Sequence, residues 1–135
     1  MGKISFPRQE VLQSLYGLTA GISENRFVST RPNAVGEQMA DFVLVRLPQT
    51  IYDRGDTYQS TKGQISVFAR DFEYGLEDTA RLEEMQQAVL ALFPIVTGRY
   101  HGKAPILVAG GSDGAGFHFL TIQFHITILK QPKTI

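Results

Sequence analysis

Two stretches of the chain place apolar residues at the three- and four-residue steps of an α-helix. The first follows Pro7, whose missing N–H costs nothing in a first helical turn, and it predicts a helix from about Pro7 to Ala20. The second predicts a longer amphipathic helix from about Leu76 to Phe93, ended by Pro94. Its apolar face consists of Leu82, Met85, Val89 and Leu92.

Apolar and β-branched runs bounded by turn residues predict three strands between residues 42 and 109. Phe42–Leu47, which ends at Pro48, is typical of a buried strand. Gln64–Asp71 is a second strand, and Pro105–Ala109 is expected to be a short buried one. Arg26–Thr30 could add a further short strand.

The clearest alternation lies in Phe117–Leu129, which predicts a long strand with one apolar and one polar face. We expect a strand of this length to bend, to bulge, or to extend to the edge of the molecule. The glycine-rich segment Gly110–Gly116 before it is expected to be a mobile hairpin connection. The polar face of the strand carries Thr121, Gln123, His125 and Thr127.

The connection Pro48–Gly63 is too long for an ordinary hairpin loop in a compact domain. Tyr and Thr residues on both sides of the turn Asp53–Asp56 favour a protruding β-hairpin, because these residues suit exposed strand pairs. Such an arm would find little to pack against in its own subunit, so we expect its partner to lie on another molecule.

Together these elements predict a single α+β domain over residues 1–135. Its expected core is a mostly antiparallel (mixed) β-sheet of about four to five strands with two helices packed against it. A long hairpin protrudes at about 48–63, and a flexible C-terminal tail is expected at about 130–135.

Composition narrows the possible functions. The 135 residues include 13 basic and 13 acidic side chains and no cysteine. The balanced charge disfavours a nucleic-acid partner, and the absence of cysteine excludes disulfides, thiolate zinc sites and cysteine nucleophiles. No apolar run approaches the length of a membrane span, so we expect no membrane partner and a cytoplasmic location.

Candidate catalytic and metal-binding groups are sparse. His118 and His125 are separated by an odd number of residues, so a regular strand points them to opposite faces, and no metal site is expected. Ser112, Asp113 and His118 could form a triad only on paper, because nothing resembles a nucleophile elbow. Arg54-Gly55-Asp56 is interpreted as a charged hairpin turn. We therefore expect no catalytic residue and no cofactor.

The order of elements resembles the tail terminator (tail completion, or neck) proteins of long-tailed bacteriophages. The resemblance is carried by Asp41–Val45 before the long hairpin, by Gln64–Ala69, and by the helix that contains Thr79–Leu82 and continues through Val89 and Leu92. It spans roughly Pro7 to Leu129, although the Gly110–Gly116 loop has no counterpart that can be matched. The glycine-rich loop therefore stays unexplained.

The resemblance implies a non-enzymatic protein that forms a homo-oligomeric ring, typically a hexamer. Such a ring caps the tail tube protein and joins it to the head-connector (neck) protein, in the host bacterial cytoplasm and then in the virion. Contacts are expected from the hairpin and from the polar face of the last strand: Thr50, Ile51, Tyr52, Arg54, Asp56, Thr57, Tyr58, Thr121, Gln123, His125 and Thr127.

Two other classes of function stay open. One is a small ligand-binding or regulatory α+β domain that dimerises through its sheet, which a concave pocket with convergent polar groups would favour. The other is a hydrolase or transferase, which would need a cleft that gathers Asp71, His101 or His125.

Overall fold

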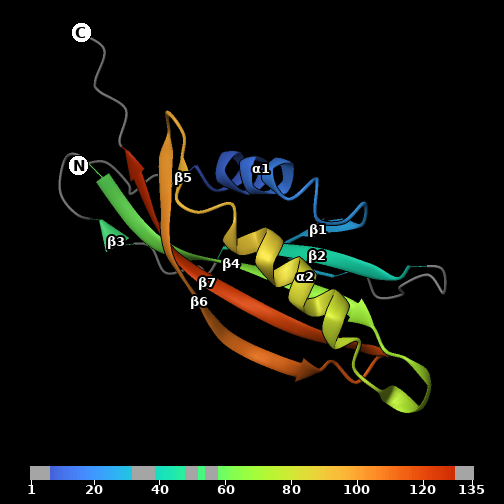
Figure 1. Ribbon diagram of the computed structural model, residues 1–135. Helices are drawn as coiled ribbons and strands as arrows, with labels where there is room; N and C mark the ends of the chain where they lie inside the picture. Colours follow the sequence, from blue (N-terminus) through green and yellow to red (C-terminus); the bar gives the residue numbers. More distant parts are fainter. Residues whose placement is uncertain (1–6, 32–38, 48–51, 54–57, 130–135) are drawn as a thin grey trace, which may run out of the picture.

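The computed structural model describes residues 7–31, 39–47, 52–53 and 58–129. Two helices and one sheet make up the fold, and both helices lie on the same side of that sheet (Figure 1). The elements in chain order are α1 (Arg8–Leu18), β1 (Arg26–Val28), β2 (Asp41–Arg46), β3 (Tyr52–Asp53), β4 (Tyr58–Arg70), the 3-10 turn η1 (Glu73–Gly75), α2 (Thr79–Leu90), β5 (Ile95–Val96), β6 (Tyr100–Ser112) and β7 (Phe117–Leu129).

The strands form one seven-stranded sheet in the order β1-β2-β4-β7-β6-β5, with β3 paired to β4. β1 runs parallel to β2 and every other pair is antiparallel, so the expected mixed and mostly antiparallel α+β architecture is confirmed. The expected count of strands was too low because β3 and β5 are two residues each, too short to leave a pattern in the sequence.

The main core lies between the helices and one face of the sheet, called here the inner face. α1 packs on β1 and β2, and α2 packs on β4 and β7. Helical spacing places one set of apolar side chains on the side of each helix that faces the sheet, and strand alternation places another set on the inner face. These two sets are the fully buried side chains. They include Val11 and Leu15 of α1, Leu82, Met85 and Val89 of α2, and Ile65, Val67, Ile122, Phe124 and Ile126 of the sheet.

α2 is shorter than the predicted helix because its N-terminus is set by a capping residue. The Asp78 carboxylate accepts a hydrogen bond from the Arg81 N–H at 3.1 Å, which starts the helix at Thr79. The segment before it forms η1, in which Tyr74 takes a left-handed φ of 64° that a helix does not tolerate.

The hairpin expectation needs a correction. β3 does pair with β4 through Tyr52↔Ser60 and Asp53↔Gln59. However, the second half of the predicted arm belongs to β4, and β4 pairs with β7 along its whole length, from Tyr58↔Leu129 to Arg70↔Phe117. This half therefore has its partner in its own subunit. The long strands accommodate their length by curling together (Figure 1).

β6 also differs from expectation. The predicted short buried strand Pro105–Ala109 is the middle of a 13-residue strand, and most of it is exposed. Gly110–Ser112 continue β6 and are not part of a mobile loop. The remaining turn is held by Asp113, whose carboxylate accepts hydrogen bonds from the N–H groups of Ala115 and Phe117 at 2.7 and 3.1 Å.

The opposite, outer face of the sheet carries a second apolar cluster at one end. Its buried residues are aromatic or leucine side chains: Phe42, Leu44, Phe68 and Phe117. The Arg31 guanidinium lies over the rings of Phe42 and Phe68, at 5.1 and 5.3 Å from their centroids, and pairs with Asp113. The outer face is therefore polar only over part of its area, and the polar face predicted for Phe117–Leu129 begins beyond this aromatic cluster.

Candidate functional site

The predicted contact residues of β7 lie together on the outer face. Thr121 is buried, and its hydroxyl is hydrogen-bonded to that of Ser66 at 2.7 Å. The Gln64 side chain donates to Gln123 at 3.3 Å on the next row. These pairs form a polar ladder within the sheet. His125 is exposed and Thr127 is half-buried, so these two offer more of their side chains to a partner.

The predicted contact residues of the hairpin are mostly outside the part of the chain that the structure describes: Thr50, Ile51, Arg54, Asp56 and Thr57. Tyr52 lies in β3, but its side chain is also outside that part. Tyr58 opens β4 with 37% of its side chain exposed. The expectation that this segment contacts another molecule stays a prediction.

A surface that the sequence did not reveal lies along β6. β5 pairs only with His101 and Gly102 of β6. Within the described residues, the edge of β6 that points away from β7 therefore has no strand partner from Pro105 onward. Ile106, Leu107 and Val108 are 57%, 53% and 43% exposed there. We call this segment, 105–112, the β6 edge.

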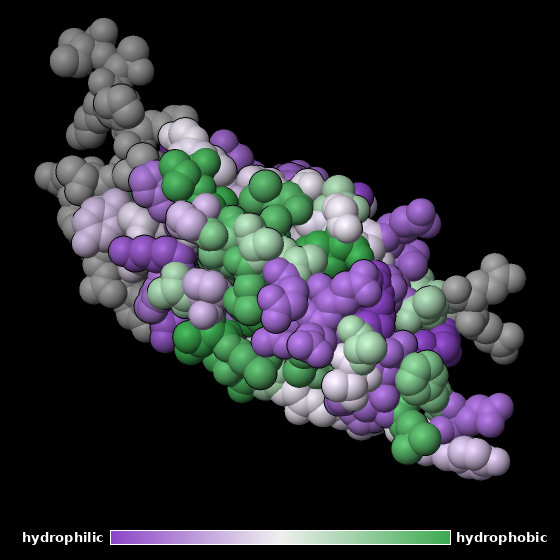
Figure 2. Space-filling view, in the orientation of Figure 1, coloured by the Kyte–Doolittle hydropathy of each residue, from purple (hydrophilic) through white to green (hydrophobic). Residues whose placement is uncertain are grey.

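More exposed apolar surface lies in the connection between β4 and α2. Phe72 and Leu76 form an isolated bridge and are 59% and 61% exposed, and Tyr74 between them is 95% exposed. Figure 2 shows hydrophobic side chains along the lower rim of the molecule and at its lower right end, on either side of a hydrophilic patch over α2. Large exposed apolar side chains in such groups are typical of contact surfaces.

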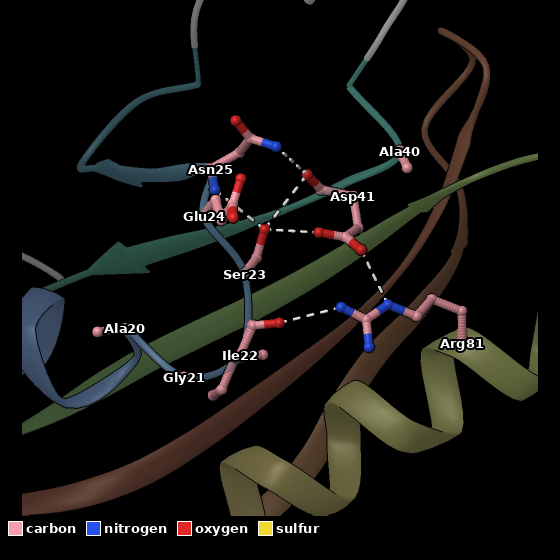
Figure 3. A pocket seen from close by; sticks show the side chains of 9 residues that line it. All are labelled: Ala20, Gly21, Ile22, Ser23, Glu24, Asn25, Ala40, Asp41 and Arg81. Carbon is pink, nitrogen blue, oxygen red and sulfur yellow. Dashed lines mark hydrogen bonds and ion pairs between the residues drawn. The ribbon is translucent and has the colours of Figure 1, made fainter.

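A polar pocket of about 400 Å³ lies where the α1–β1 connection meets β2 and α2. Figure 3 shows Arg81 reaching from α2 toward Asp41 and the Ile22 carbonyl. Its Nε donates to Asp41 at 2.8 Å and a terminal nitrogen donates to Ile22 at 3.0 Å. The Ser23 hydroxyl donates to the same carboxylate, and Asn25 donates to the Asp41 carbonyl at 3.1 Å.

These contacts bond the side chains of Arg81, Asp41, Ser23 and Asn25 to partners within the chain. Arg81, the pocket's cation, also binds Glu84 at 2.9 Å. The arrangement ties three segments together, and a ligand would have to break those bonds before it could form its own. The pocket is therefore better explained as a structural junction than as a binding site.

The candidate catalytic residues are not gathered in a cleft. His118 lies on the inner face, where its Nδ1 is 2.5 Å from the Asp71 carboxylate. The hydrogen bond to Asp71 raises the pKa of His118, against the opposing effect of desolvation. His101 and His125 are exposed on β6 and β7, and Asp113 is bound to Arg31.

The Ser112–Asp113–His118 arrangement does not form. The Ser112 hydroxyl accepts the Gly114 N–H, and Asp113 and His118 have separate partners. Among the described residues there is no group of three potential metal ligands, and no helix is long and apolar enough to cross a membrane.

Comparison with solved structures finds proteins that share this fold. No protein-family model and no curated protein matches the chain. A solved structure described only by a reference number aligns with a TM-score of 0.60 and 12% identity, over 97% of this chain and 100% of the other. A chain from a structure of the virion of a native gene transfer agent (GTA) particle aligns with a TM-score of 0.52 and 15% identity, over 93% and 100%. At these identities the likeness establishes the shared fold.

Proposed function

We propose that this chain is a structural protein of a phage-type particle, and specifically a ring-forming tail terminator that caps the tail tube and joins it to the head connector. The protein acts by assembly and not by catalysis. The fold it shares with a chain from a GTA virion supports the general role, and the order of elements in the sequence supports the specific one.

The observation that carries the proposal is the β6 edge. An edge strand with free N–H and C=O groups pairs readily with another chain, and natural proteins usually protect such strands with charges, prolines or bulges. Here the edge begins with Pro105, and bulges lie between Lys103 and Ile106 and between Leu107 and Ala109. Three large apolar side chains remain exposed around them, which is the composition of an edge that becomes covered in an assembly.

The alternative of a small ligand-binding domain would place its ligand in the Asp41–Arg81 pocket. Because Arg81, Asp41 and Ser23 there are already bonded to one another, assembly explains the exposed surfaces better.

Electron microscopy of particles assembled with and without this protein tests the proposal. We expect particles that contain it to show a ring at the head-proximal end of the tail, and particles that lack it to have tails without a cap that fail to join heads. Normal, joined tails in its absence would reject the proposal.

A further inference from the structure

The chain is neutral as a whole, but its exposed charges are segregated between its two sides. A row of basic side chains crosses the polar part of the outer face: Lys62 on β4 is in register with His125 on β7, which is in register with Lys103 on β6. Strands lie about 4.8 Å apart, so the row spans about 10 Å. Arg46 on β2 adds a further exposed cation on the same face. We call these four residues the basic face.

No carboxylate balances the basic face within the part of the chain that the structure describes. The acidic side chain nearest this side of the sheet is Asp113, and it is bound to Arg31. Arg46, Lys62 and Lys103 form no ion pair with any described residue. Their charges are therefore available to a partner.

The opposite side of the molecule is acidic. Exposed carboxylates line α2 and the connection before it: Glu73, Glu77, Glu83 and Glu84. The cation among them, Arg81, is bound by Asp41 and Glu84. We call these four glutamates the acidic face, and part of it forms the hydrophilic patch over α2 in Figure 2.

We infer that neighbouring copies of this chain contact each other head to tail, with the basic face of one copy against the acidic face of the next. The inference rests on the proposed function, because a ring requires a heterologous contact between two different surfaces of the same subunit. A second copy of this chain is the favoured partner because its own two faces neutralise the charge of both the basic and the acidic face. A different acidic partner would leave the acidic face uncompensated. Complementary charge of this kind sets orientation and suppresses the symmetric, face-to-same-face pairing that would give closed dimers.

Charge reversal on each face tests the inference. One variant carries Lys62→Glu and Lys103→Glu, and the other carries Glu73→Lys and Glu83→Lys, whose side chains make no described hydrogen bond or ion pair. Gln9→Glu with Gln13→Glu on the exposed side of α1 is the control, since it adds charge to a helix that carries neither face. Circular dichroism and thermal unfolding first establish that each variant is folded. Self-association is then measured by analytical ultracentrifugation at about 50 mM and about 500 mM salt, with tail tubes added if the chain alone stays monomeric.

We expect each reversed variant to associate with itself about a hundredfold more weakly than the wild type, since like charges then face each other. An equimolar mixture of the two variants should associate again, because the first has two acidic faces and the second has two basic ones. The control should match the wild type, and high salt should weaken wild-type association.

Two outcomes overturn the inference while leaving the proposed function intact. One is a ring that forms equally well from either reversed variant. The other is that the wild type binds a DNA duplex of about 30 base pairs and the Lys62→Glu, Lys103→Glu variant does not, while the two proteins associate with themselves equally well. If the wild type forms no ring even on tail tubes, the proposed function itself fails.

Discussion

At the scale of single residues, Gly63 shows how tightly the inner face of the sheet packs. A Cβ at this position would lie 2.7 Å from Ile126 Cδ1 and 2.7 Å from Phe124 Cζ. Both neighbours are themselves fully buried, so they have little space into which to move.

We therefore predict that Gly63→Ala lowers the free energy of unfolding by about 1–3 kcal/mol, as overpacking of a core does. Gly17→Ala in α1 is the matched control, because nothing lies within 4 Å of the added Cβ. It should raise stability by up to about 0.5–1 kcal/mol, since alanine is a better helix former than glycine, although Gly17 lies in the last turn of α1. Urea denaturation measures both, and a Gly63→Ala variant as stable as the wild type would contradict the described packing.

His118 gives the fold a dependence on pH. Because the hydrogen bond to Asp71 raises its pKa above the ordinary 6.5, protonated His118 stabilises the folded state. That contribution to the free energy of unfolding is complete below pH 6.5. It is lost as the pH rises through the higher pKa that His118 has in the folded protein. We predict that His118→Gln removes this part of the decline in stability as the pH rises above about 6.5. The free energy of unfolding of both proteins is measured by urea denaturation across this pH range, and a His118→Gln variant with the wild-type pH profile would contradict the prediction.

At the scale of elements, the sequence predicts the bounds of helices and strands best where a regular pattern of apolar residues is long and marks one face. β7 was predicted with its observed bounds because thirteen residues alternate between the core and the outer face. α1 and β2 were also close to their observed bounds. The helix α2 was overestimated because the pattern continues through residues that flank it, whereas the cap at Asp78 depends on local backbone geometry.

The surfaces were harder to predict than the elements. Pro105–Ala109 has the composition of a buried strand, and only the strand order shows that β6 lies next to the end of the sheet with its middle exposed. The second aromatic cluster was missed for a related reason. Phe42, Phe68 and Phe117 come from three strands, so their contact depends on register, which the sequence of each strand does not contain.

The β6 edge leads to a prediction at this scale. Leu107→Lys should leave the free energy of unfolding within about 0.5 kcal/mol of the wild type, because the side chain is already 53% exposed. The same change should prevent assembly onto tails, since a lysine on an edge strand opposes the approach of another strand. Leu18→Lys on α1, which is 39% exposed, is the control and should assemble normally. Assembly of the Leu107→Lys variant at the wild-type level, measured by its co-sedimentation with tails, would show that the edge is not a contact.

At the scale of the whole molecule, the described surfaces have distinct locations. The apolar β6 edge lies along one rim of the sheet, while the basic and acidic faces lie on opposite sides of the two layers. A subunit organised in this way can contact two neighbours through its faces and a further chain through its edge. The Asp41–Arg81 junction ties α2 to β2 and to the segment before β1, and Arg81 also binds Glu84 of the acidic face.

The mass of the assembled protein tests the central claim most directly. Native mass spectrometry of the chain alone, and after incubation with purified tail tubes, distinguishes a ring from a monomer or a dimer. The account predicts a discrete closed oligomer, a hexamer by analogy with tail terminators, that forms alone or on the tubes. A chain that remains monomeric under both conditions, or that forms only a symmetric dimer, would contradict it.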